Sequence, residues 1–63
     1  MNHDQQSIIA AYDAAVQKLY STLFDQFAET AGNEVQMREA EQRFSSGLGF
    51  ARQARDRALA LIA

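Results

Sequence analysis

The sequence predicts an all-α fold, an antiparallel hairpin of two long helices, and three observations carry this prediction. Two runs of apolar residues at helical spacing flank a short Ala-Gly-Asn segment at residues 31–33. Gly32 can adopt the left-handed conformation that ends a helix, and Asn33 can cap the next one. Proline is absent from the 63 residues, so nothing forces either helix to stop early. We therefore expect helices over about residues 5–30 and 34–62.

The first helix is expected to begin at Asp4 or Ser7, which are both good N-cap residues, and to end near Thr30. Its apolar residues step alternately by three and four positions, which is the a/d pattern of a coiled coil. This pattern predicts a seam of large side chains that faces the second helix. The seam consists of Ile9, Tyr12, Val16, Leu19 and Leu23.

The second helix is expected to begin after Asn33, because Asn33 and Gln36 resemble a capping box. Its seam again alternates steps of three and four, but most of its residues are small. Large side chains of the first helix would then face small ones of the second, which permits close approach. This second seam consists of Met37, Ala40, Phe44, Gly47, Ala51, Ala54, Ala58 and Leu61.

Gly47 and Gly49 lie in the middle of the second helix, where each glycine lowers helix stability by about 1 kcal/mol relative to alanine. In one interpretation the helix is continuous, and Gly47 makes room for Leu19 or Tyr20. In the other the helix breaks there, and Ser46 caps a third helix. We favour the continuous helix because the a/d spacing crosses the segment without a change of phase.

A single domain over residues 1–63 leaves little room for a core. Ordering a residue costs roughly 1.5 kcal/mol, so a chain of this length gains little net stability from its own buried area. Cysteine is absent, which excludes disulfides, and there is one histidine. Association is the remaining route to stability, and a twofold homodimer that forms a four-helix bundle is the simplest closed solution.

Large apolar residues outside the two seams support the same expectation. Burying one such side chain fully stabilises a protein by about 1.5–3 kcal/mol, so several exposed together favour association. The alternatives are that Tyr20 and Phe24 are scattered surface residues, or that a kink at Gly47 wraps the second helix over them. The expected self-association surface consists of Tyr20, Phe24, Phe27, Leu48 and Phe50.

The sequence predicts no catalytic residue, no cofactor and no metal site. Ser45 and Ser46 have no histidine near in sequence that could serve as a base. The Gly47–Gly49 segment lacks the Lys-Ser/Thr of a phosphate loop. His3 could complete a copper or nickel site with the terminal amine, but a polar, frayed terminus is the better interpretation.

The only basic cluster gives an alternative function, binding of RNA or DNA through phosphates. Asp56 lies inside this cluster, and the net charge of the chain is −2, so we favour arginines that are solvated or paired with acids. The candidate nucleic-acid face consists of Arg43, Arg52, Arg55 and Arg57.

The leading hypothesis is a small non-enzymatic helical protein that binds itself and presents a helical surface to a protein partner. The polar residues 1–4 contain no secretory signal, and the apolar run at residues 58–63 is far shorter than the ~20 residues that span a bilayer. We therefore expect a cytoplasmic protein without a membrane partner.

Overall fold

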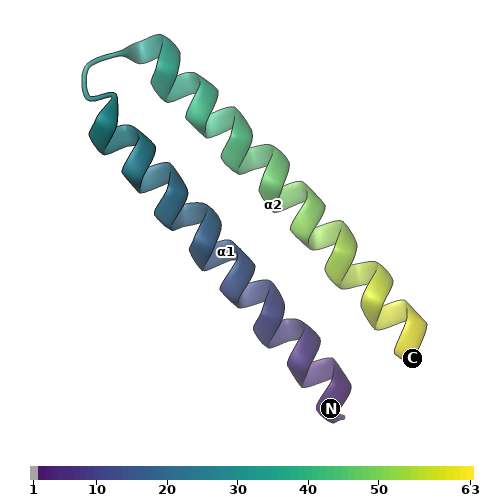
Figure 1. Cartoon of the computed structure of the whole chain (residues 1–63). Helices are drawn as coiled ribbons and strands as arrows, with labels where there is room; N and C mark the ends of the chain where they lie inside the picture. Colours follow the sequence, from purple (N-terminus) through teal and green to yellow (C-terminus); the bar gives the residue numbers. More distant parts are fainter. Residues whose placement is uncertain (1) are drawn as a thin grey trace.

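The computed structural model describes residues 2–63, which form two α-helices, α1 (His3–Glu29) and α2 (Glu34–Ile62). The helices lie antiparallel, side by side, and their free ends lie at the same end of the molecule (Figure 1). The hairpin is a rod with extents of 46 × 15 × 10 Å. The predicted all-α hairpin is confirmed, and α2 passes through Gly47 and Gly49 without a break.

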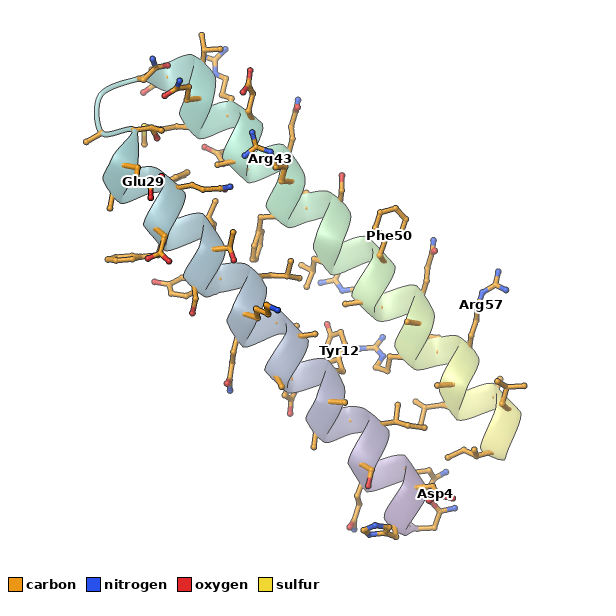
Figure 2. The ribbon with its side chains drawn as sticks, viewed as in Figure 1. Asp4, Tyr12, Glu29, Arg43, Phe50 and Arg57 are labelled. Atoms are coloured by element: carbon orange, nitrogen blue, oxygen red, sulfur yellow. The ribbon has the colours of Figure 1, made fainter. Side chains whose placement is uncertain are left out.

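The two helices meet through the predicted large-to-small packing. The seam residues of α1 are all half-buried, and Tyr12 points toward α2 (Figure 2). Leu19 lies against Gly47, where an added methyl group would be 2.6 Å from Leu19 Cδ2. The side-chain hydrogen bonds and ion pairs of residues 2–63 lie within single helices or at their ends. Side-chain packing therefore holds the two helices together.

The seam of α2 follows the prediction as far as Ala51; beyond it Ala58 is half-buried as expected, but Ala54 and Leu61 are not. Leu61 is 86% exposed and Ala54 is also exposed, whereas Arg55 and Ile62 are half-buried. A repeat of 3.5 residues drifts by about 20° per heptad around a straight α-helix of 3.6 residues per turn. Over the length of α2 this drift turns Leu61 away from α1, so its assignment to the seam was wrong.

The start of α1 also differs from the prediction, because Asn2 is its N-cap instead of Asp4 or Ser7. The Asn2 side-chain oxygen accepts a hydrogen bond from the Gln5 backbone N–H (2.7 Å). In return, Gln5 Oε1 accepts one from the Asn2 backbone N–H (3.0 Å). This reciprocal capping box starts the helix earlier than predicted. Asp4 then lies in the first turn, where its carboxylate complements the positive end of the helix dipole.

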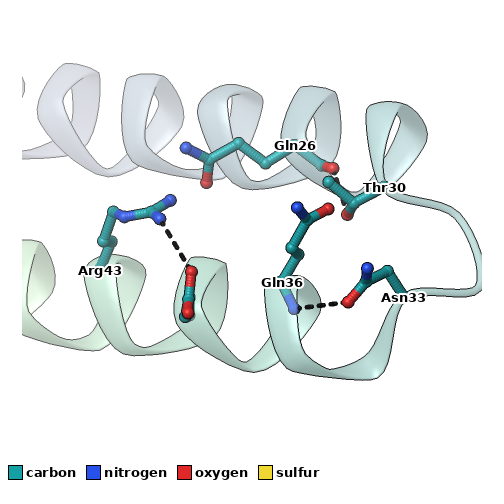
Figure 3. A network of polar contacts seen from close by, with 6 residues as sticks. Gln26, Thr30, Asn33, Gln36 and Arg43 are labelled. Atoms are coloured by element: carbon teal, nitrogen blue, oxygen red, sulfur yellow. Dashed lines mark hydrogen bonds and ion pairs between the residues drawn. The ribbon is translucent and has the colours of Figure 1, made fainter.

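The connection between the helices matches the predicted turn and is closed by local hydrogen bonds (Figure 3). The Thr30 hydroxyl and backbone N–H both donate to the Gln26 carbonyl, at 2.7 and 3.0 Å. Gly32 has a φ of +85°, in the left-handed region that favours glycine. The Asn33 side-chain oxygen accepts a hydrogen bond from the Gln36 N–H (3.0 Å), which confirms the predicted cap. The Asn33 N–H donates to the Thr30 carbonyl (2.9 Å) and not to the Gln36 side chain. Asn33 and Gln36 therefore form one of the two hydrogen bonds of a capping box.

Candidate association surfaces

The hairpin is far more exposed than a compact protein of its size. Among residues 2–63 only Ala40 is fully buried, at 1% exposure. The chain exposes 4836 Å² to solvent, whereas a compact folded monomer of this mass exposes about 4,000 Å². Its radius of gyration is 14.6 Å, against about 11 Å for a compact domain of this length. The hairpin therefore leaves more of its surface in contact with water than a compact fold of the same mass would.

Three of the five residues predicted for self-association are largely exposed. The exposed fractions are 60% for Tyr20, 61% for Phe24 and 70% for Phe50. Phe27 and Leu48 are half-buried along the inner edges of the two helices. The structure thus leaves the rings of Tyr20, Phe24 and Phe50 largely in solvent, whereas Phe27 and Leu48 pack partly within the hairpin.

The five residues do not lie on one surface. Tyr20 and Phe27 are seven positions apart, about two turns, so they share one side of α1, which we call the aromatic side. Phe50 follows Leu48 by two positions, so the two side chains leave α2 in nearly opposite directions. Phe50 projects away from α1 (Figure 2). It lines a shallow hollow together with Arg43 and Gly47.

Sequence reasoning missed two further exposed apolar residues. Val35 is 66% exposed in the first turn of α2, and Leu61 is 86% exposed in the last. Leu61 could have been found by following a period of 3.6 residues through α2 instead of a strict heptad. No sequence pattern distinguishes Val35, which stands alone on the outer surface.

An apolar groove runs between the helices along one side of the hairpin, which we call the groove side. It consists of two adjoining stretches that share Ala15 and Ala51. Gly47 and Thr22 line the stretch nearer the turn, and Ile8 lines the stretch nearer the free ends. The small side chains leave the space between α1 and α2 open to solvent. We call it the alanine groove after its residues Ala11, Ala15, Ala40, Ala51, Ala54 and Ala58.

Arg55, one of the four candidate nucleic-acid residues, is engaged within the hairpin. Its guanidinium carbon lies 4.5 Å from the centre of the Tyr12 ring, a cation–π contact between α2 and α1. Arg55 Nε donates a hydrogen bond to Asp56 Oδ1 at 2.9 Å. This bond raises the pKa of Arg55 above its ordinary value, and partial burial opposes the shift. Arg55 therefore keeps its charge and uses it to join the two helices.

The other three arginines do not converge on one face. Arg43 lies 3.7 Å from Glu39 in an exposed ion pair. Arg52 follows Arg43 by nine positions, about two and a half turns, and so lies on the opposite side of α2. Arg57 is exposed and projects into solvent (Figure 2). The four arginines therefore do not share one side of α2.

Residues considered for catalysis or metal binding lie apart from one another. Ser45 and Ser46 are exposed on a polar part of α2, beside Arg38. His3 is exposed, and the Met1 amine invoked for a copper site lies outside the described residues. Over residues 2–63, no three acidic or histidine side chains gather as metal ligands would. Over the same residues, neither helix combines the length and apolar character needed to cross a membrane.

Comparison of the chain with known protein families, with curated proteins and with solved structures finds no match.

Proposed function

We propose that this protein is a small self-associating helical module, in which two hairpins pack into a homodimeric four-helix bundle. The observation that carries the proposal is the excess of exposed surface, about 800 Å² above that of a compact monomer. One partner contributes about 800 Å² to a protein–protein interface of standard size. A dimer of this kind would bring the exposure of each chain to the value expected for its mass.

The distribution of large apolar side chains supports the same proposal. Phe50 and Leu61 are 70% and 86% exposed, yet neither has a polar group that would benefit from solvent. Fully burying a side chain of this size stabilises a protein by about 1.5–3 kcal/mol. Two hairpins that cover these residues would gain stability that one hairpin lacks.

In this proposal the chain acts by binding and not by catalysis, and the outer helix surfaces of the dimer are presented to a protein partner. Binding of RNA or DNA is not proposed, because Arg52 lies on the opposite side of α2 from Arg43 and Arg55 is already engaged with Tyr12 and Asp56. Phosphate recognition needs several cations that act together on one face.

The proposal is tested by light scattering of the purified chain over a dilution series. The mass should approach twice the 7.0 kDa of the single chain at high concentration and fall toward 7.0 kDa on dilution. A folded species of 7.0 kDa at every concentration would contradict the proposal.

A further inference from the structure

We propose that a second copy of this chain docks along the alanine groove and inserts Phe50 into the middle of it. The inference rests on the proposed self-association and specifies which surface performs it. The groove and the side chain that fills it belong to the same side of the same chain, so two copies related by a twofold axis satisfy each other.

Neighbouring residues establish that Phe50 belongs to the groove side. Phe50 borders Arg43 and Gly47, and both of these line the alanine groove. Ala54, another groove residue, follows Phe50 by four positions and is therefore its neighbour on the helix surface. Leu61 follows Ala54 by seven positions and so lies on this side as well. The small residues form the cavity, and the two large exposed residues border it.

Each helix carries a second seam on this side, as a four-helix bundle requires. In such a bundle every helix faces two neighbours in directions about 90° apart, and each direction needs its own stripe of suitable residues. On α2 positions 43, 47, 50, 54 and 61 advance by helical steps of four, three, four and seven. On α1 positions 8, 11, 15, 18 and 22 advance by steps of three and four. These stripes stand beside the inner seams, toward the groove side.

The small groove residues explain why a helix can enter. Alanine at Ala11, Ala15 and Ala54 removes the bulk that would hold a second hairpin away, and close approach increases dispersion contacts. Lys18 and Arg43 also line the groove, but their long side chains can lie along an apolar surface while the charged ends stay in water. Arg55 lines the groove as well, and the Asp56 carboxylate balances its charge. The charged groups that line the groove therefore either reach water or keep a partner within the hairpin.

The aromatic side is less suited to the same role. Asp13 precedes Tyr20 by seven positions and is exposed on that side, and Glu41 and Arg52 stand on the corresponding side of α2. Burying these charges without partners would be costly. On the aromatic side, the half-buried Phe27 and Leu48 fill space between the helices. On the groove side, alanines leave the corresponding space open.

The place of Phe50 along the rod makes its insertion independent of dimer orientation. Phe50 lies close to the midpoint of α2, which runs over Glu34–Ile62. A twofold axis parallel to the rod, or perpendicular to it, keeps the middle of one hairpin over the middle of the other. Both arrangements therefore place Phe50 over the part of the partner's groove where its two stretches meet.

The first test compares two adjacent alanines of α1. Ala15 and Ala14 are both exposed in the hairpin, but only Ala15 is among the groove-lining residues. The variants Ala15→Lys and Ala14→Lys make the same change in charge, size and helix propensity. We expect Ala15→Lys to weaken the dimer at least about tenfold in light scattering and sedimentation, while Ala14→Lys keeps the dissociation constant of the natural chain.

The second test removes one aromatic ring from each side of the hairpin. Phe50→Ala and Phe24→Ala delete the same atoms from residues of similar exposure, 70% and 61%. We expect Phe50→Ala to raise the dissociation constant about tenfold or more, and Phe24→Ala to leave it within about twofold. Circular dichroism at matched concentration checks that each variant retains its helices.

The outcomes separate this inference from the proposal on which it rests. A natural chain that is monomeric throughout defeats self-association itself. A dimer that is weakened by Phe24→Ala and unaffected by Ala15→Lys and Phe50→Ala retains self-association but moves it to the aromatic side, which overturns the inference. Equal effects within either pair of variants also overturn it, because the groove would then have no special role.

Discussion

Leu19 of α1 packs directly on the α2 backbone at Gly47, with a methyl group at that position placed 2.6 Å from Leu19 Cδ2. Two carbon atoms in contact normally lie about 3.5–4.0 Å apart, so no side chain fits there without movement. The helices approach one another this closely because α2 has only backbone at this point. Gly47, although it lies inside a helix, thus makes the close packing of α1 on α2 possible.

The two interior glycines of α2 should respond oppositely to alanine. Gly49 has nothing within 4 Å of an added methyl group, so Gly49→Ala should raise the free energy of unfolding by about 0.5–1 kcal/mol through helix propensity. Gly47→Ala gains the same propensity but must displace Leu19, and we expect a net loss of stability. Urea denaturation at fixed protein concentration measures both. Equal stabilisation by the two substitutions would show that Leu19 does not restrict Gly47.

Removing the Leu19 side chain should reverse the sign of the Gly47 substitution. Leu19→Ala alone should lower the free energy of unfolding by about 2 kcal/mol or more, as for leucines in protein cores. In that background Gly47→Ala no longer meets the leucine, so it should stabilise the chain through helix propensity. A double-mutant cycle of urea midpoints measures this coupling. Additive effects would rule out direct packing between the two residues.

The hairpin, its turn and the continuity of α2 could be predicted because local signals agree with the global fold. Gly32 supplies the left-handed residue, Asn33 supplies a cap, and the unbroken spacing through Gly47 indicates one helix. The prediction that Gly47 makes room for Leu19 or Tyr20 was confirmed for Leu19. These features depend on local backbone and capping preferences and on the volumes of facing side chains.

Features that depend on the direction in which a residue points around the helix axis could not be predicted as well. The drift between 3.5 and 3.6 residues per turn turned Arg55 inward and Leu61 outward. The same geometry separates Phe50 from Tyr20, although both were grouped as one surface. The Asn2 cap had a readable signal, because Gln5 stands three positions later, but Asp4 and Ser7 competed with it as equally good caps.

The contact between Arg55 and Tyr12 should contribute to hairpin stability in a way that lysine cannot replace. Arg55→Lys loses the planar group over the ring and the Nε–H bond to Asp56, so we expect a lower thermal midpoint than that of the natural chain. Arg57→Lys, at an exposed position, is the control and should change little. Thermal denaturation of both variants gives the comparison, and matching midpoints would contradict a structural role for Arg55.

The same contact should not respond to pH in the neutral to moderately alkaline range. Because Asp56 raises the pKa of Arg55 in the folded chain, the linked stability is present below the ordinary arginine pKa and is lost only as pH rises through the folded value. The difference in unfolding free energy between the natural chain and Arg55→Lys should therefore stay constant over this range.

The turn should tolerate asparagine better than alanine at Gly32. A φ of +85° places this residue where a Cβ atom is strained, at roughly 1–2 kcal/mol for an ordinary residue. Asparagine adopts left-handed backbone more readily than alanine, so Gly32→Asn should be less destabilising than Gly32→Ala. Nothing lies within 4 Å of the added methyl group, so any loss reports backbone conformation and not a clash. Urea midpoints that rank alanine above asparagine would argue for a different turn.

The thermal midpoint of the natural chain should rise with protein concentration. Apolar packing and the contact of Arg55 with Tyr12 join α1 to α2, and Ala40 is the one fully buried residue among those described, so folding and association should be strongly coupled. Mass action then stabilises the folded dimer as the chain becomes more concentrated. Reversible melting followed by circular dichroism over a hundredfold range of concentration measures the effect. The Ala15→Lys variant, whose groove is blocked, should melt at a lower temperature and with a weaker dependence on concentration. A midpoint of the natural chain that does not move over this range would mean that one hairpin is sufficient for stability.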